Sequence, residues 1–233
     1  MSVTVVIPTT GNSSAIKAVM SVKNQTFKDV VPLLVYDGPD FPKLDLDCDS
    51  MVLPYNTGAG GFYGHRIYAS ISALLNTDYV MFLDEDNWYE LDHVESLMKV
   101  TKENNYLWAY SLRKIYENGE YVCDDNCESL GQWPVYISQS HFLVDTSCYC
   151  IRRDVAIQFC HAIYGKWGAD RQLLSVLKQY APNFGSSKKH TLCYQLGGNI
   201  GSVTKDFFEK GNAEMATRYP DGFPWHANSL AGQ

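Results

Sequence analysis

Short apolar runs that alternate with helix-like segments constrain the fold of this chain most strongly. The run "VTVVIP" (3–8) is rich in β-branched residues and ends at a proline, which is typical of a strand buried on both faces. Similar runs occur at 30–38, near 50–55 and at 78–86, and Ser13 or Ser14 can cap a helix after the first run. The pattern predicts an α/β fold: a Rossmann-like, mostly parallel central sheet flanked by helices, with ligands at the carboxyl ends of the strands.

The pattern changes after about residue 105. "YLWAYSLRKIYENGEYVC" (106–123) alternates around an Asn-Gly pair, which predicts an antiparallel hairpin. A strand is expected near 147–152, helices at about 154–164 and 169–179, and a lid or loose tail beyond Gly211. Because no repeat or linker is evident, residues 1–233 are expected to form one domain. Its nucleotide-binding half runs to about residue 104, and a smaller, mixed half occupies about 105–233.

Charge and cysteine content exclude several classes of protein. The 233 residues include 19 Lys and Arg against 26 Asp and Glu, a net charge of −7, so nucleic acid is not expected as a partner. Seven scattered cysteines indicate reduced, cytoplasmic thiols, and Cys123 and Cys127 lack the further ligands that a zinc site needs. Since no stretch approaches the ~20 apolar residues of a membrane span, no transmembrane segment is expected.

The glycine-rich stretch "GAGGFYG" (58–64) invites comparison with dinucleotide-binding loops. The fingerprint G-x-G-x-x-G, begun at Gly58, requires a glycine where this sequence has Tyr63. The first strand also continues into "PTTGN" instead of a glycine turn. The spacing argues against an NAD- or FAD-dependent oxidoreductase, and leaves open a plain turn or a loop that packs against a phosphate or sugar.

Carboxylates mark the ends of two predicted strands. Asp37 ends the second, and Asp84, Glu85 and Asp86 end the fourth. Asp84 and Asp86 are one residue apart, so at an extended strand end they point to the same side. Like charges at this spacing repel one another unless a cation or hydrogen-bond donors stabilise them, and Mg²⁺ or Mn²⁺ commonly binds one or two carboxylates plus substrate phosphates. A divalent metal site is expected here, with a solvated acidic turn as the alternative.

Six segments, in this order, resemble the motifs of the family-2 glycosyltransferases of GT-A fold. They are "VTVVIPTTGN", "VYDGPD", "NTGAGGFYGHRIYASI", "YVMFLDEDNW", "DTSCYCIRRD" and "WGADRQLL", which together span roughly residues 3 to 177. The resemblance implies a GT-A-type fold and a metal-dependent, inverting transfer of a sugar from a nucleotide-diphosphate sugar to a hydroxyl of a glycan or glycoconjugate. A UDP-sugar is the expected donor, with guanosine and thymidine diphosphate sugars left open.

The resemblance also implies roles for individual residues. The expected nucleotide-binding residues are Pro8, Thr9, Asp37, His65, Arg66 and Asp84. Asp86 would hold the Mn²⁺ or Mg²⁺ ion of the D-x-D motif, and Asp170 would be the catalytic base. His190 is expected to reach the metal from the second half, and His226 is a further candidate for that place. The sequence departs from the family pattern at two places. In the pocket for the nucleotide base, "YDGP" (36–39) replaces Asp-Asp-Gly-Ser, and before the catalytic base, Ala169 replaces a Glu.

Two other classes of function stay open. A sugar nucleotidyltransferase would share the sheet and the metal, but it would have a glycine-rich, basic opening loop, unlike "IPTTGN". A degenerate, non-catalytic sugar-nucleotide-binding module is the second alternative, against which the intact Asp84, Asp86 and Asp170 argue. Three tryptophans are candidates for stacking on sugar rings, although most aromatic residues belong to a core: Trp133, Trp167 and Trp225.

Overall fold

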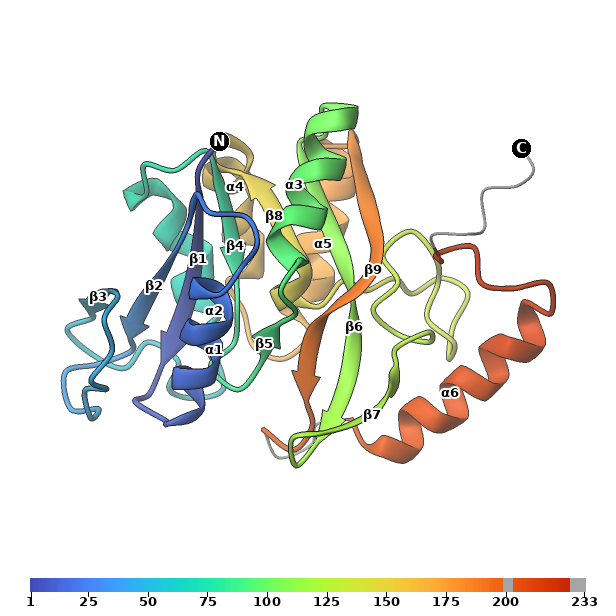
Figure 1. The fold of residues 1–233 in the computed structure, drawn as a ribbon, viewed down its shortest axis with the longest axis horizontal. Helices are drawn as coiled ribbons and strands as arrows, with labels where there is room; N and C mark the ends of the chain where they lie inside the picture. Colours follow the sequence, from blue (N-terminus) through green and yellow to red (C-terminus); the bar gives the residue numbers. More distant parts are fainter. Residues whose placement is uncertain (199–202, 227–233) are drawn as a thin grey trace.

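One continuous sheet organises the computed structural model, which describes residues 1–198 and 203–226 (Figure 1). Its first part is parallel. Strand β1 (Val3–Thr9) lies between β2 (Val30–Tyr36) and β4 (Tyr79–Phe82), and β3 (Asp49–Val52) pairs with the far side of β2. Every residue of β1 and β4 is buried, which accounts for their predominantly apolar sequences.

The second part joins the first through β8 (Tyr149–Arg152), which is antiparallel to both β4 and β6 (Trp108–Glu117). Strand β9 (Phe184–Gln195) runs parallel to β6. Strand β7 (Glu120–Asp124) pairs antiparallel with β6, and β5 (Trp88–Tyr89) pairs antiparallel with β9. Since β8 opposes both of its neighbours, β6 and β9 point the same way as β1, β2 and β4. The carboxyl ends of these strands therefore meet at one edge of the sheet.

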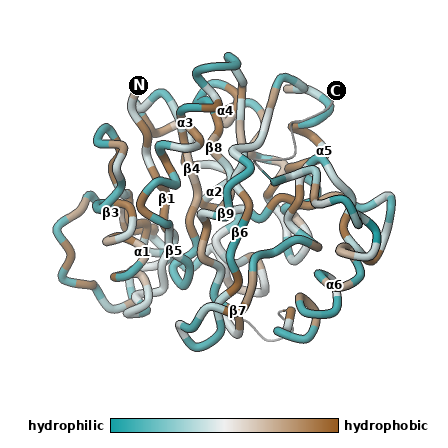
Figure 2. Tube along the Cα trace, turned by 45° about the vertical axis from the view of Figure 1, so that its right-hand side comes forward, coloured by the Kyte–Doolittle hydropathy of each residue, from teal (hydrophilic) through white to brown (hydrophobic). Residues whose placement is uncertain are grey.

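Helices cover both faces of the sheet. In Figure 1, α1 (Ser14–Lys23) and α3 (His93–Asn104) lie in front of it, whereas α4 (Arg153–Phe159) and α5 (Ala169–Tyr180) lie behind. The short α2 (His65–Ser70) packs with the 3₁₀ turn Cys160–Ile163 that follows α4. Two further 3₁₀ turns cover Ile71–Leu74 and Thr146–Cys148. Apolar segments are concentrated in the central strands in Figure 2. Together these features confirm the predicted α/β fold.

The segment after Gly211 differs from the expected loose tail. Helix α6 (Lys205–Arg218) begins at Thr204, whose hydroxyl accepts a hydrogen bond from the Phe207 N–H, and it buries Phe208, Gly211 and Met215 against β7 and its surroundings. The expectation of a lid or loose tail is therefore wrong up to residue 218, and residues 227–233 lie outside the described part of the chain. No helix among the described residues is long and apolar enough to span a bilayer.

Candidate functional site

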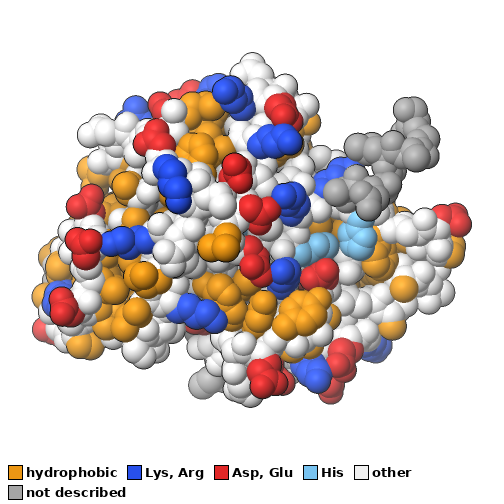
Figure 3. Space-filling model, in the orientation of Figure 1, with side chains coloured by type: hydrophobic (Ala, Val, Ile, Leu, Met, Phe, Trp, Pro, Cys, Tyr) orange, Lys and Arg blue, Asp and Glu red, His pale blue; other side chains and the backbone are white. Residues whose placement is uncertain are grey.

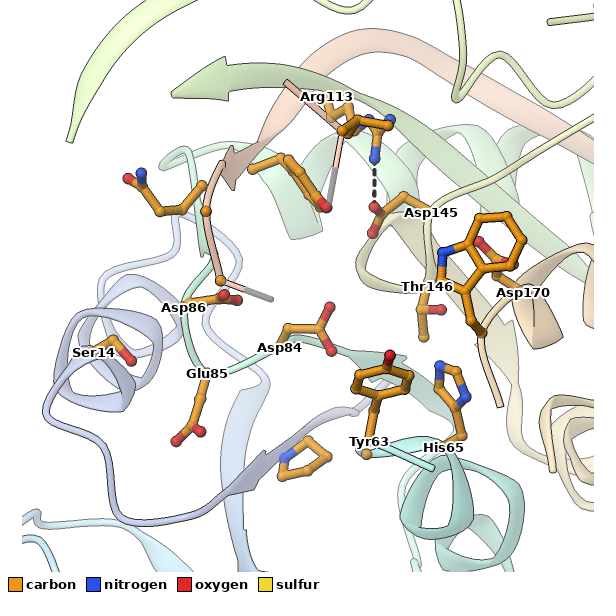
Figure 4. Close-up of a pocket in the computed structure, with 18 of the residues that line it drawn as sticks. Ser14, Tyr63, His65, Asp84, Glu85, Asp86, Arg113, Asp145, Thr146 and Asp170 are labelled. Atoms are coloured by element: carbon orange, nitrogen blue, oxygen red, sulfur yellow. Dashed lines mark hydrogen bonds and ion pairs between the residues drawn. The ribbon is translucent and has the colours of Figure 1, made fainter. Parts of the chain in front are cut away.

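A pocket of about 730 Å³ lies where the carboxyl ends of the parallel strands meet. Its walls come from segments far apart in the sequence: the end of β1, the loop after β4, the middle of β6, the first turn of α5 and the residues after β9. Seven of the nine predicted site residues line it: Pro8, Thr9, Asp37, His65, Asp84, Asp86 and Asp170. Figure 4 shows Asp84, Asp86 and Asp170, with Asp145, around one open space.

The three carboxylates after β4 have different partners. Asp84 accepts a hydrogen bond from the Tyr68 hydroxyl (2.8 Å). Glu85 turns away from Asp84 (Figure 4) and accepts hydrogen bonds from the hydroxyls of Thr9 (2.5 Å) and Thr10 (2.9 Å), so it fixes the loop after β1. Asp86 packs against Gly198, where any side chain would collide with its Oδ2 atom. Only the outer two carboxylates of the trio are thus directed at the centre of the pocket.

Burial makes ionisation of these two carboxyls costly. Desolvation, with the charges of Asp86 and Asp145, raises the pKa of Asp84 to about 7. Desolvation is also the largest cause that raises the pKa of Asp86 to about 6, and Glu85 and Asp145 add to it. Near neutral pH Asp84 is therefore only partly ionised, and the surroundings disfavour negative charge on both carboxyls. A divalent cation would relieve that cost, so the donor set fits the oxygen-ligand chemistry of Mg²⁺ or Mn²⁺.

Asp37 shapes the glycine loop. Its carboxylate accepts hydrogen bonds from the Thr57 N–H and hydroxyl (2.7 and 2.6 Å) and from the Gly58 N–H (2.7 Å). A β-carbon on Gly58 would collide with the Tyr63 carbonyl oxygen, which explains the glycine at this position. Arg66, predicted to be a nucleotide-binding residue, does not line the pocket. Its guanidinium lies 3.5 Å from the Phe62 ring centroid and donates to the Thr57 carbonyl oxygen (3.2 Å), so it supports the same loop from behind.

Asp170 lies in the first turn of α5. This helix begins at Ala169, directly after Gly168, which has a left-handed backbone conformation. Its Oδ1 atom accepts a hydrogen bond from the Arg171 N–H (2.8 Å). Burial is the largest cause that raises the pKa of Asp170, and the charge of Asp145 adds to it. His65, at the start of α2, holds the loop that precedes α5: its Nδ1 atom shares a hydrogen bond with the Gly165 carbonyl oxygen (2.8 Å). Asp170 is thus a partly buried carboxyl with a raised pKa in a pocket, as a general base is expected to be.

A buried arginine cluster forms another wall, and sequence reasoning missed it. Arg113 of β6 is 2% exposed and contacts three carboxylates: Asp125 (2.8 Å), Asp145 (2.7 Å, Figure 4) and Glu128. Arg113, Glu128 and Asp145 all line the pocket. Asp145 belongs to the segment "DTSCYCIRRD" (145–154), which resembles a family motif, but no role was assigned to it. Nothing in the strand pattern around Arg113 distinguished this residue from a surface residue.

His190 lies elsewhere, which corrects its assignment to the metal. It lines a second pocket, of about 410 Å³, with Asp124 and His226 among its neighbours, and its ring centroid is 5.6 Å from that of His226. Figure 3 shows histidine side chains beside acidic and basic ones on this face of the molecule. The middle of β9 faces this second pocket, while Tyr194 and Gln195 at its end reach the first one. Neither histidine is therefore placed beside Asp86.

Curated relatives match about half of the chain. An uncharacterised glycosyltransferase of Rickettsia felis is 31% identical over 126 residues, which are 52% of this chain and 21% of the relative. A second uncharacterised glycosyltransferase, from Rickettsia conorii, is 30% identical over 126 residues, or 52% of this chain and 20% of the relative. The matched region is thus about a fifth of the length of each relative. No protein-family model matches the sequence.

Solved structures share the fold. The structure of S. aureus TarS residues 1–349 superposes with a TM-score of 0.64 at 15% identity, over 100% of this chain and 76% of that one. The same protein in complex with UDP-GlcNAc gives a TM-score of 0.63 at 15% identity, over 93% of this chain and 67% of that one. The complex of TarS residues 1–349 with UDP gives a TM-score of 0.60 at 15% identity, over 100% of this chain and 76% of that one. The chain therefore has the mixed α/β fold of TarS-type structures.

Proposed function

We propose that this chain is the catalytic part of a metal-dependent, inverting glycosyltransferase of family-2 type. It would transfer a sugar from a nucleotide-diphosphate sugar, a UDP-sugar in the first instance, to a hydroxyl of a glycan or glycoconjugate. One observation carries the proposal: Asp84, Asp86 and Asp170 line one pocket at the carboxyl edge of an α/β sheet, although Asp170 is far from the other two in the sequence. The names of the Rickettsia relatives and the UDP-GlcNAc complex of TarS support the same reaction class.

The pocket chemistry supports a metal bridged to a diphosphate. No group of three or more His, Cys, Asp or Glu side chains in the described residues is arranged to hold a metal by itself. Mg²⁺ and Mn²⁺ in nucleotide sites commonly take one or two carboxylates and complete their shell with water and phosphate oxygens. Asp86, with Asp84 beside it, would supply the protein ligands. The bound ion would stabilise the charge of the departing diphosphate.

The remaining chemistry falls to the chain's own residues. Asp170 would accept the proton of the acceptor hydroxyl while that oxygen forms a bond to the anomeric carbon and the bond to the diphosphate oxygen breaks. A raised carboxyl pKa makes this proton transfer more favourable near neutral pH. Attack from the face opposite the leaving group inverts the anomeric centre. Pro8, Thr9 and Asp37 would form the nucleoside end of the pocket, and Asp84 would face the ribose.

Nucleotide binding is the first experiment. A thermal-shift series would compare uridine, guanosine, thymidine, cytidine and adenosine diphosphates, each with Mn²⁺ and with chelator. A ligand that binds only the folded state stabilises it by about 2.7 kcal/mol at a hundredfold excess over Kd. We expect a shift for one nucleotide, strongest for uridine diphosphate, that chelator removes.

The variants Asp86→Ala and His190→Ala serve as a matched pair in the same series. Asp86→Ala should lose the metal-dependent shift, whereas His190→Ala, in the second pocket, should keep it. No shift with any nucleotide would contradict the proposal. Turnover that requires a sugar 1-phosphate and a nucleoside triphosphate would favour a nucleotidyltransferase instead.

A further inference from the structure

Trp167 differs from the two other tryptophans that were candidates for stacking on sugars. Trp225 is fully buried, and Trp133 packs against the core with its ring centroid 5.6 Å from that of Trp225. Trp167 is 75% exposed, more than any other large apolar side chain of the described residues, and it lines the candidate active-site pocket. An indole left in water gains no folding free energy, so its place at the mouth of a pocket indicates a contact made with a ligand.

A second exposed aromatic side chain, Tyr63, lines the same pocket. Tyr63 is 39% exposed and has a φ of 52°, a left-handed conformation that is rare and strained for a bulky residue. The segments that carry Tyr63 and Trp167 are joined to each other. His65 Nδ1 bonds the Gly165 carbonyl oxygen (2.8 Å), and the rings of Phe62 and Tyr164 lie 6.0 Å apart. Figure 4 shows Tyr63 and His65 on the side of the pocket that also holds Asp170.

Charge decides which kind of ring fits this aromatic pair. The side chains lining the pocket carry seven carboxylates and two guanidinium groups: Asp37, Asp84, Glu85, Asp86, Glu128, Asp145 and Asp170 against Arg113 and Arg171. Arg113 is already bound to three carboxylates. Because carboxylates outnumber guanidinium groups in this lining, a neutral ring rich in hydroxyls, which can donate hydrogen bonds to carboxylates, is favoured over an anionic ring.

We infer that Trp167 and Tyr63 form a stacking subsite for a neutral pyranose ring of the acceptor. Trp167 precedes the candidate base Asp170 by three residues in the sequence. The inference rests on the proposed function and deepens it, because it names the acceptor as a carbohydrate without acidic groups. The apolar face of the ring lies on the indole, and the edge of the ring presents a hydroxyl toward Asp170. Arg171, whose guanidinium lies 4.9 Å from the indole centroid, holds the Trp167 side chain in place.

Saturation-transfer NMR tests the subsite without turnover. The probes are the methyl β-glycosides of glucose, galactose, N-acetylglucosamine and glucuronic acid at millimolar concentration, in the presence of uridine diphosphate and Mg²⁺, which is diamagnetic. A methyl aglycone cannot itself stack. We expect saturation transfer to the ring protons of at least one neutral glycoside and none to the glucuronide. Trp167→Ala should weaken binding by about tenfold, since removing one ring-stacking contact has an effect of that order.

Trp167→Phe keeps an aromatic ring and should restore part of the binding. Tyr180→Ala is the matched control, because Tyr180 is 61% exposed at the other end of α5 and does not line the pocket. With a transferable donor, the Trp167 variants should raise the acceptor KM and leave the donor KM unchanged. A nucleotide-dependent thermal shift combined with no signal from any neutral glycoside, or with equal signals from wild type and Trp167→Ala, would overturn this inference alone. Absence of the nucleotide shift would overturn the proposed function itself.

Discussion

Asp170 carries the sharpest prediction at the scale of single residues. Asp170→Asn keeps the size of the side chain and the acceptor for the Arg171 N–H, but it removes the base, so sugar transfer should fall by at least about 10²-fold. Nucleotide binding should persist. The rate of transfer and the nucleotide-induced thermal shift would be measured on the same preparation. Asp206→Asn, in the first turn of α6 and exposed, is the control, and transfer close to normal in Asp170→Asn would place the base elsewhere.

Arg113 is the residue on which the pocket wall depends for stability. Arg113→Met leaves Asp125, Glu128 and Asp145 buried without their cation, and loss of one partner of a buried ion pair costs about 3–5 kcal/mol. Urea unfolding would measure the change in free energy of unfolding. Arg152→Met removes an exposed pair with Asp154 and should cost at most about 1 kcal/mol. Equal effects of the two substitutions would show that the buried cluster contributes no special stability.

The sequence predicted the acidic and strand-end residues better than the arginine wall. Asp37 and Asp84 could be located because they follow continuous buried runs, and the ends of parallel strands converge on one edge. Arg113 occupies a position in a strand that reads as half-exposed, and only the packing of the segment 125–128 and of Asp145 over that face makes it buried. His190 lies within β9, five residues before Gln195, and only the end of this strand reaches the first pocket, a distance that the sequence pattern did not reveal.

At the scale of elements, the start of α3 makes stability depend on pH. His93 is fully buried, stacks on Tyr89 with ring centroids 3.7 Å apart, and shares a hydrogen bond through Nδ1 with Thr191 Oγ1 (2.9 Å). Burial lowers the pKa of His93 to about 3, far below the 6.5 of an unfolded chain. The unfolded state therefore binds a proton that the folded state does not, so this stabilisation is complete above pH 6.5 and is lost as the pH falls toward 3.

His93→Phe retains a ring against Tyr89 and removes the titration. Between pH 7 and pH 5, wild type should lose about 2 kcal/mol more stability than the variant, at roughly 1.4 kcal/mol per pH unit below 6.5. Urea unfolding at both pH values gives the comparison, and carboxyl groups common to both proteins cancel in the difference. The control is His161→Phe, at an exposed position. Parallel pH profiles for wild type and His93→Phe would contradict the assignment.

Elements with continuous apolar runs were predictable, and those with interrupted patterns were not. The strands β1, β2 and β4 and the Asn118-Gly119 hairpin are where the pattern indicates them. Strand β9 was missed because its polar "SSKKH" segment conceals the strand that pairs with β6. Helix α6 was missed because Gly211 reads as a helix breaker, whereas its missing side chain allows close contact with Cys127. Only tertiary contacts reveal that second role.

At the scale of the whole molecule, the sheet couples the two halves of the sequence. Strand β4 pairs with β1 on one side and with β8 on the other, so the first 104 residues alone would expose a buried strand edge. We expect one cooperative unfolding transition for the full chain, with coincident circular dichroism and fluorescence curves. Residues 1–104 produced alone should give no dispersed NMR spectrum. Two separate transitions, or a folded fragment, would contradict the expectation of one domain.

The exposed indole also gives the protein an optical readout. All five tryptophans lie in the described part of the chain, and Trp167 is the one that is exposed. Collisional quenching by acrylamide would therefore act mainly on this ring, which lines the same pocket as Asp170. A molecule that covers the indole would shield it from the quencher and shift its emission to the blue. The wild-type chain thus contains its own label for screening acceptors, before any product has been identified.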